Sequence, residues 1–453
     1  MKTRHWRTAI CAAALAALTA GADAGDSATD IADPRELTPL GERLVFAAYQ
    51  PSLSQALFAV SGRSGALELL SPLRPGFRGA FPNTLVRLRD TVYFTMNDGE
   101  SGPELWATEG TPATTRLVAD IRPGAAGSNP AGLTVFDGQL YFSASGSGTG
   151  PRLWSSRGTK DSTAAVANAA ALANPRQFTV VGARLFFTAT DAAHGDELWV
   201  IERGGAAPRL VSDIRRGPED AAIAQLTVVG DALYFVAHDG VHGAELWKTD
   251  GSADGTALVK DIRPGPDGSR PSYLAAHGDG LLFAADDGQL GGELWRSNGR
   301  ETALVLDVRP GAANSGAAYL TNVGAWTYFT ATNGRDGLEL WKTDGSAAGT
   351  ALVRDLLPGP DGALPNHLTR IGDRLYFAAV DGARQQQPWR SDGTAAGTQR
   401  IGNASDPVGL PYPSRFTAFG DGIAFAARDA AGTERLWRMD AAGAISRLGA
   451  ASP

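Results

Sequence analysis

Residues 226–261 read LTVVGDALYFVAHDGVHGAELWKTDGSADGTALVKD, and this stretch decides the fold. It contains four short segments rich in β-branched and aromatic residues, which are the residues that pleated strands favour. The segments are separated by Gly230-Asp231, Asp239-Gly240 and Asp250-Gly251, and such pairs are strong turn signals. Helical periodicity is almost absent. The stretch therefore predicts four antiparallel strands joined by tight turns.

The same four-segment pattern recurs along the chain, and tryptophan marks its period. Eight of the ten tryptophans follow one another at intervals of 45 to 48 residues, and Phe58 stands one period before the first of them. The series therefore has nine members. Four strands repeated at this period are typical of the blades of a β-propeller. The eight tryptophans are Trp106, Trp154, Trp199, Trp247, Trp295, Trp341, Trp389 and Trp437.

We therefore expect an all-β fold, a single β-propeller of nine four-stranded blades over residues 36–453. Stacked sheets bury the side chains between them, so the eight repeated tryptophans are expected to lie between neighbouring blades. Most propellers have about four to eight blades, and eight blades plus a flanking sheet is the alternative. Residues 25–35 are interpreted as an N-terminal linker. Asp30-Ile31 resembles the strand end Asp261-Ile262, so this linker could pair with the last blade and close the ring.

The first 24 residues have the pattern of a secretory signal peptide. Positive charges precede residue 8, residues 8–21 are apolar and small, and Ala22-Asp23-Ala24 matches a cleavage site. We expect a secreted or periplasmic protein. Cys11 is the only cysteine and lies in this segment, so the mature chain is expected to lack disulfides and cysteine metal sites.

Charge and hydropathy narrow the range of partners. The formal net charge is −7 over 453 residues, and no basic patch stands out. This balance argues against nucleic acid and against anionic membrane surfaces. No segment after the signal is apolar enough to insert into a membrane. We expect a monomer that presents one propeller face to a glycan or a protein ligand.

Residues 245–252 read ELWKTDGS, and this string resembles the repeat of the bacterial ELWxxDGT repeat family. The string recurs at residues 339–346, and part of it recurs at 389–394. The resemblance covers essentially the whole mature chain and implies an exported protein built from repeats. Phe58, Arg152 and Arg435 interrupt the Glu-Leu-Trp string in the first, third and ninth units.

A weaker similarity links the same region to quinoprotein propellers. Ala237, Asp239, Gly243, Glu245 and Trp247 have the spacing of the tryptophan-docking motif of that family. The similarity implies that the tryptophan is wedged between neighbouring blades. It does not imply the quinone, and no cofactor is expected.

An acidic or amide residue stands eight positions before seven of the tryptophans. Calcium is one interpretation, since hard cations take six to eight oxygen ligands. Each turn offers about one carboxylate, however, so we favour the interpretation that aspartate caps the hairpin through its own backbone. No metal site is predicted. The seven residues are Asp98, Asp191, Asp239, Asp287, Asn333, Asp381 and Asp429.

Six residues are candidates for ligand binding. The arginine of the Asp-Ile-Arg-Pro-Gly segment could bind a carboxylate or sulfate, or could pair with the repeated glutamates of adjacent blades. Two histidines stand five residues before their tryptophans and could help bind a metal or sugar, or could be solvated turn residues. A tryptophan outside the period could stack on a sugar or a protein. The candidates are Arg122, Arg263, Arg309, His194, His242 and Trp326, with Arg74 and Arg215 at the same repeat position as the three arginines.

No catalytic residues are predicted. A nucleophile elbow, a phosphate-binding loop and a glycosidase acid pair are not recognisable in the sequence. We expect an exported binding or interaction module for a glycan, a cell-surface polymer or a protein. The alternatives are a carbohydrate-active enzyme with a site over the central channel, and a structural or adhesive envelope protein.

Overall fold

The computed structural model describes residues 30–62, 64–71, 77, 79–205, 207–382, 385–402 and 409–449. The predicted signal peptide, with Cys11, and the candidate Arg74 lie outside the described residues. In the described part of the chain, no helix has the length and apolar character needed to cross a membrane.

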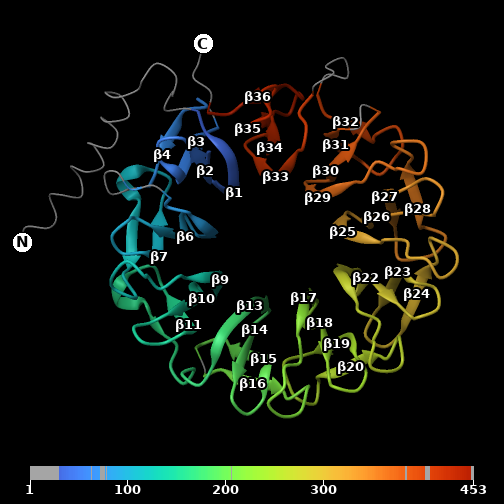
Figure 1. Ribbon diagram of the computed structural model, residues 1–453, viewed down its shortest axis with the longest axis horizontal. Helices are drawn as coiled ribbons and strands as arrows, with labels where there is room; N and C mark the ends of the chain where they lie inside the picture. Colours follow the sequence, from blue (N-terminus) through green and yellow to red (C-terminus); the bar gives the residue numbers. More distant parts are fainter. Residues whose placement is uncertain are drawn as a thin grey trace, which may run out of the picture. The chain divides into compact units, whose positions relative to one another are not determined.

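The described residues form nine four-stranded antiparallel sheets, each built from four consecutive strands (Figure 1). The fold is an all-β, nine-bladed β-propeller, as the sequence predicts. The alternative of eight blades with a flanking sheet is wrong. Blades are numbered 1 to 9 in chain order.

Each blade begins with a strand that carries a bulge and continues with a buried second strand. The first strands are β1 (Ala32–Leu40), β5 (Asn83–Leu88), β9 (Ala131–Phe136), β13 (Ala173–Val181), β17 (Ala224–Val229), β21 (Ser272–His277), β25 (Ala318–Val323), β29 (Asn366–Ile371) and β33 (Ser414–Phe419). The second strands are β2 (Arg43–Gln50), β6 (Thr91–Asn97), β10 (Gln139–Ser145), β14 (Arg184–Asp191), β18 (Ala232–His238), β22 (Gly280–Asp286), β26 (Trp326–Ala331), β30 (Arg374–Val380) and β34 (Gly422–Arg428).

The third strand carries the tryptophan, and the fourth is short. The third strands are β3 (Ser54–Ser61), β7 (Pro103–Thr108), β11 (Pro151–Ser156), β15 (Gly195–Glu202), β19 (Ala244–Thr249), β23 (Gly292–Ser297), β27 (Glu339–Thr343), β31 (Gln386–Ser391) and β35 (Glu434–Met439). The fourth strands are β4 (Leu67–Leu69), β8 (Arg116–Ala119), β12 (Ala164–Ala165), β16 (Arg209–Ser212), β20 (Ala257–Lys260), β24 (Thr302–Leu306), β28 (Ala351–Arg354), β32 (Gln399–Arg400) and β36 (Ile445–Arg447). Two 3₁₀ turns, η1 (Pro112–Thr114) and η2 (Lys160–Ser162), precede β8 and β12.

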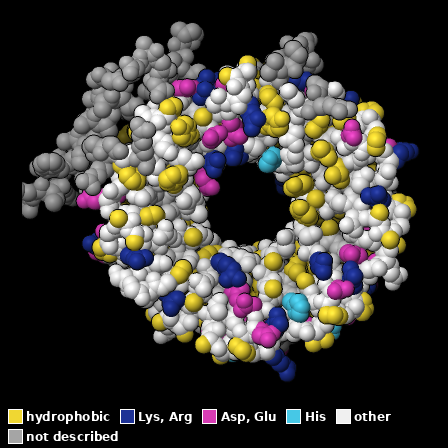
Figure 2. Space-filling model, viewed as in Figure 1, with side chains coloured by type: hydrophobic (Ala, Val, Ile, Leu, Met, Phe, Trp, Pro, Cys, Tyr) yellow, Lys and Arg dark blue, Asp and Glu magenta, His cyan; other side chains and the backbone are white. Residues whose placement is uncertain are grey.

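The chain divides into two compact units. Unit 1 holds the described residues up to Phe178 together with those from Thr417 onward, and unit 2 is Thr179–Phe416. Within unit 2, the first strands β17, β21, β25 and β29 contact one another in series. On the face shown in Figure 2, acidic and basic side chains are interspersed, and neither sign forms a continuous patch.

One phenylalanine per blade forms the centre of the core. It lies on the second strand, is completely buried and pairs across the sheet with the repeated tryptophan, or with Phe58 in blade 1. In unit 2, Trp341 of blade 7 packs in one cluster with Leu282 and Leu294 of blade 6. The nine phenylalanines are Phe46, Phe94, Phe142, Phe187, Phe235, Phe283, Phe329, Phe377 and Phe425.

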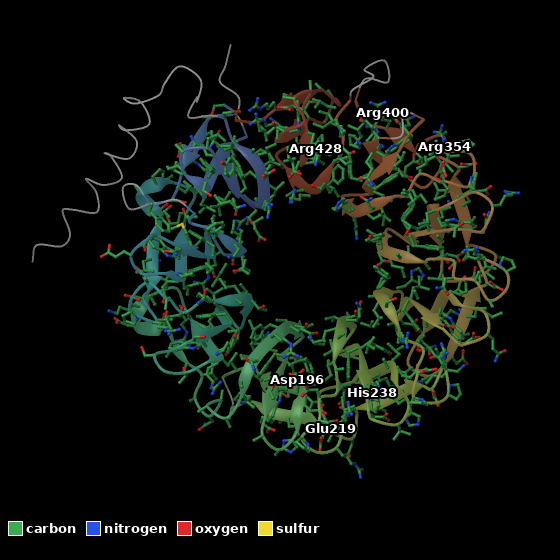
Figure 3. All side chains as sticks on the ribbon, in the orientation of Figure 1. Asp196, Glu219, His238, Arg354, Arg400 and Arg428 are labelled. Atoms are coloured by element: carbon green, nitrogen blue, oxygen red, sulfur yellow. The ribbon has the colours of Figure 1, made fainter. Side chains whose placement is uncertain are left out.

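A glycine at the start of the third strand of the blade is required because two backbone segments approach closely there. Gly195 has a φ of +66°, and a Cβ atom built on it would lie 2.6 Å from the Glu219 carbonyl oxygen. The next residue, Asp196, donates its N–H to Asp220 Oδ1 at 2.8 Å, and Figure 3 labels Asp196 on β15 and Glu219 in the connection from β16 to β17. Only glycine fits both the space and the φ angle. Gly243 meets the same constraint in blade 5, which explains the recurrence of this glycine.

In unit 1, the first described residues contact blade 9. Arg435 Nη1 lies 2.5 Å from Asp30 Oδ1 and donates to the Ile31 carbonyl at 2.6 Å. The Ile31 side chain is buried in one cluster with Leu436 and Leu448. The first strand, β1, begins at Ala32, four residues before the start expected from the sequence. The expected pairing of the linker with blade 9 therefore consists of the Arg435 contacts and the burial of Ile31, and Asp30 and Ile31 do not form an additional strand of that sheet.

Candidate ligand-binding site

The glutamate of the Glu-Leu-Trp string is completely buried and binds the loop that leaves its own blade. In blade 5, Glu245 Oε1 accepts the backbone N–H groups of Arg263 at 3.1 Å and Ser269 at 2.8 Å. Glu245 Oε2 accepts the Ser269 hydroxyl at 2.5 Å. In blade 8 the same position is Gln387, whose Oε1 accepts the N–H of Leu410 at 3.0 Å. The glutamate therefore holds the connection to the next blade in place. The buried glutamates are Glu104, Glu197, Glu245, Glu293 and Glu339.

Burial of these glutamates makes the stability of the fold depend on pH. Burial raises the pKa of Glu197, Glu293 and Glu339 to about 7, although backbone N–H groups partly oppose this shift. The unfolded chain has the ordinary glutamate pKa, so between about pH 4.5 and 7 the folded state binds more protons. The contribution to stability is complete below this window and is lost as the pH rises through it. We expect the melting temperature to fall from pH 5 to pH 8. Over this range the free energy of unfolding should decrease by roughly 1–3 kcal/mol per carboxyl group.

Calorimetry at pH 5, 6, 7 and 8 tests this expectation, with Glu293→Gln as the matched variant. Gln387 shows that the amide is accepted at this position, and the amide does not titrate. The variant should therefore lose the part of the pH dependence that Glu293 contributes. A melting temperature that rises or stays level between pH 5 and pH 8 in the unaltered chain would contradict it.

The predicted turn aspartates hold their hairpins as backbone caps. Asp239 Oδ1 accepts the N–H groups of Val241 and His242, both at 2.9 Å. The His242 ring is paired with this same aspartate, with Nδ1 2.7 Å from Asp239 Oδ2. In blade 4, His194 Nδ1 lies 2.9 Å from Asp191 Oδ2. The hydrogen bonds raise the pKa of both histidines.

Among the described residues, no group of three or more histidine and acidic side chains could hold a metal ion. Each of the two histidine rings contacts the aspartate of its own turn. A part for either residue in ligand binding stays a prediction.

The repeated arginines make two kinds of contact. In three blades the backbone N–H group of the arginine binds the buried glutamate of the same blade, as seen for Arg122 with Glu104 at 3.0 Å, and in blade 6 Val308 takes this part. The guanidinium of Arg263 pairs with Asp286 of the next blade at 3.1 Å and with Asp267 at 3.3 Å, and not with a repeated glutamate.

The third candidate arginine, Arg309, donates to the Asn314 carbonyl at 3.3 Å. Binding of a ligand carboxylate or sulfate by Arg122, Arg263 or Arg309 stays a prediction. Figure 3 labels another arginine, Arg354 of blade 7, which donates to the Thr398 carbonyl of blade 8 at 2.8 Å.

Trp326 is half-buried at the start of β26. Lys342 covers its ring, with Nζ 4.3 Å from the ring centroid. The same Nζ donates to the Gly393 carbonyl of blade 8 at 2.8 Å. A ligand that stacks on Trp326 has to displace this cation–π contact.

The most unusual backbone of the fold lies in the first strand of each blade. One residue there, which we call the bulge residue, has a positive φ in every blade, although eight of the nine are not glycine. In β21, Ser272 pairs with Ala284 and Ala275 with Leu282, so Tyr273 and Leu274 together face one residue. The bulge residues are Glu36, Thr84, Gly132, Gln177, Gln225, Tyr273, Tyr319, His367 and Arg415.

The bulge is held by local hydrogen bonds. Thr321 Oγ1 donates to the carbonyl of the bulge residue Tyr319 at 3.0 Å and lies 3.3 Å from the Leu368 carbonyl of the next blade. A positive φ in a residue other than glycine costs about 1–3 kcal/mol. Because the backbone is the same in each blade and the side chain differs, this position is suited to specific recognition.

Three consecutive bulges of unit 2 form a cavity of about 300 Å³. It is lined by the bulge regions of β21, β25 and β29 and includes Tyr273, Tyr319 and His367. The two tyrosine rings lie 5.5 Å apart at 55° to each other. They remain 42% and 46% exposed, which is high for large aromatic side chains. We call this the tyrosine cavity.

The sequence predictions do not include the residues of the tyrosine cavity. A signal is nevertheless present, because every bulge residue stands 22 positions before its tryptophan, or before Phe58 in blade 1. Aligned on that spacing, two neighbouring units carry tyrosine where their neighbours carry glutamine or histidine. The positive φ itself leaves no trace in residue type.

The similarities to known proteins are confined to solved structures. No protein-family model and no curated protein matches the chain. A crystal structure of puromycin hydrolase matches with a TM-score of 0.42 and 14% identity, over 91% of this chain and 59% of that one. A structure from an analysis of two prolyl endopeptidases matches with a TM-score of 0.47 and 12% identity, over 95% and 60%. A puromycin-hydrolyzing peptidase of Mycobacterium tuberculosis matches with a TM-score of 0.43 and 11% identity, over 88% and 58%. The chain thus spans about three fifths of the length of these structures, and at such identities the likeness concerns the fold alone.

Proposed function

We propose that this chain is an exported β-propeller that binds a glycan of the cell surface through the tyrosine cavity. The observation that carries the proposal is the pair Tyr273 and Tyr319, two exposed aromatic rings held on strained bulges beside one cavity. Export is inferred from the signal pattern of the first 24 residues, and the resemblance to ELWxxDGT repeats supports it.

The chemistry of the tyrosine cavity suits a sugar ring. A pyranose has an apolar face of C–H groups and a rim of hydroxyl groups. Aromatic faces contact the former, while the tyrosine hydroxyls and the His367 ring can hydrogen-bond the latter. The bulges also leave backbone groups without ladder partners.

The size of the tyrosine cavity favours a glycan over a protein partner. At about 300 Å³ it lies at the lower end of the range of small-ligand pockets. A protein interface buries roughly 800 Å² on each partner, much more than a cavity of this kind offers. The bulge backbone sets the direction in which both side chains leave their strands before the ligand arrives, which lowers the entropy lost on binding.

Affinity electrophoresis of the mature chain against a panel of soluble polysaccharides and peptidoglycan fragments tests the proposal. We expect retention by one of them and about tenfold weaker binding for Tyr319→Gln. Glutamine is the natural bulge residue of blade 5, Gln225, so the bulge backbone accepts this change. Tyr412→Gln is the control, because Tyr412 is 47% exposed with a positive φ and does not line the cavity. No retention on any polysaccharide, or equal retention of Tyr319→Gln, would overturn the proposal.

A further inference from the structure

A second cavity of unit 2, which we call the blade 6 pocket, lies where the repeat is interrupted. It measures about 340 Å³ and is formed by the β21–β22 turn, the β23–β24 turn and the β27–β28 turn of blade 7. Its polar lining includes His277, Asp279, Arg296 and Glu301. It shares no lining residue with the tyrosine cavity.

The residue after the tryptophan usually binds the next blade when it is basic. Lys248 donates to the Gly299 carbonyl at 2.7 Å, and Lys342 donates to the Gly393 carbonyl at 2.8 Å. Arg296 occupies the same position in blade 6. By this rule its guanidinium would bind the β27–β28 turn.

His277 makes that contact instead. Its Nε2 lies 2.9 Å from the Asp344 carbonyl oxygen in the β27–β28 turn, and its Nδ1 lies 2.9 Å from Thr327 Oγ1. In the other blades this position is apolar, as with Val229 and Val323, both largely buried. His277 thus bridges blades 6 and 7 without Arg296. Within the described residues its guanidinium has no hydrogen bond or ion pair.

Gly280 opens the space around Arg296. The equivalent residue in blade 7 is Trp326, which fills the corresponding region together with Lys342. In blade 4 it is Arg184, whose side chain lies against the Gly251 turn. A Cβ atom on Gly280 would fall on the Ser297 carbonyl oxygen, so the backbone of this hairpin accepts only glycine.

We propose that the blade 6 pocket binds a small zwitterion, with the carboxylate of the ligand on the Arg296 guanidinium and its ammonium group facing Asp279 and Glu301. An unpaired guanidinium binds a carboxylate through two parallel hydrogen bonds. Two carboxylates beside it repel a simple anion but attract a ligand that also carries a positive group. A free α-amino acid has this chemistry and fits the volume.

Isothermal titration of the mature chain with L-alanine, L-lysine and potassium acetate tests the proposal. We expect saturable binding of the amino acids, acetate binding at least tenfold weaker, and at least tenfold weaker amino-acid binding by Arg296→Gln. Glu301→Gln should weaken L-alanine binding while leaving acetate binding unchanged or stronger. Unaltered amino-acid binding by Arg296→Gln, absence of amino-acid binding in the unaltered chain, or equal binding of acetate would overturn it.

Two controls separate this site from other causes. Arg390→Gln removes the arginine of blade 8 that corresponds to Arg296. In that blade Arg374 stands at the position of Gly280, so the variant should bind amino acids as the unaltered chain does. Tyr319→Gln should leave amino-acid binding unchanged, so failure of this proposal and of the glycan proposal can be told apart. Equal losses in Arg296→Gln and Arg390→Gln would contradict a site in blade 6.

Discussion

Replacing Glu245 by alanine is expected to destabilise the fold by about 3–5 kcal/mol. The change leaves the N–H groups of Arg263 and Ser269 and the Ser269 hydroxyl without their acceptor in a buried position. It also opens a small cavity beside the core of the blade. Urea unfolding, followed by tryptophan fluorescence, measures the loss as a shift of the midpoint.

Glu245→Gln is the matched variant and should cost no more than about 1 kcal/mol. The natural Gln387 in blade 8 accepts the same backbone contact from Leu410, which shows that an amide suffices there. A loss below 1 kcal/mol for the alanine variant, or equal losses for both variants, would show that the glutamate does not hold the loop.

Replacing Arg435 by alanine is the second change with a large expected effect, about 2–4 kcal/mol. Its guanidinium is 11% exposed and contacts Asp30, the Ile31 carbonyl and, at 3.0 Å, Asp429. The variant loses these contacts of the N-terminal segment with blade 9 in unit 1, while Arg447 still lies 3.2 Å from Asp30. Urea unfolding should show the loss, and limited proteolysis should show faster cleavage near Ile31.

Arg152→Ala is the control for this prediction. Arg152 occupies the equivalent position in blade 3, but its Nη1 donates only to the neighbouring Pro151 carbonyl. Its replacement should cost less than about 0.5 kcal/mol, as is usual for surface positions. Equal effects of the two arginine variants would mean that Arg435 does not hold the N-terminal segment.

The repeat made the scaffold predictable from the sequence. The tryptophan spacing and the Gly-Asp and Asp-Gly turns predict four strands per unit and nine units, and the structure has both. The alanine-rich run of blade 3 yields the two-residue β12, and β32 of blade 8 is equally short. At these positions the local preference of the residues for strand or turn agrees with the packing of the blades, so the sequence pattern predicts the strands correctly.

The candidate sites were harder to predict because they depend on backbone geometry and on single departures from the repeat. The positive φ of Tyr273 and Tyr319 arises from a bulge, and seven different residue types occur at that position along the chain. The bridge between blades 6 and 7 beside Arg296 depends on a contact made by His277 to a turn 67 residues away. Neither effect follows from the pattern of a single unit.

A crystal structure of the mature chain with an oligosaccharide from a polysaccharide that retains the chain tests glycan binding by the tyrosine cavity most directly. We expect a sugar ring in the tyrosine cavity, in contact with the rings of Tyr273 and Tyr319 and within hydrogen-bond distance of His367. A sugar bound elsewhere on the chain, with both tyrosine rings uncovered, would contradict it.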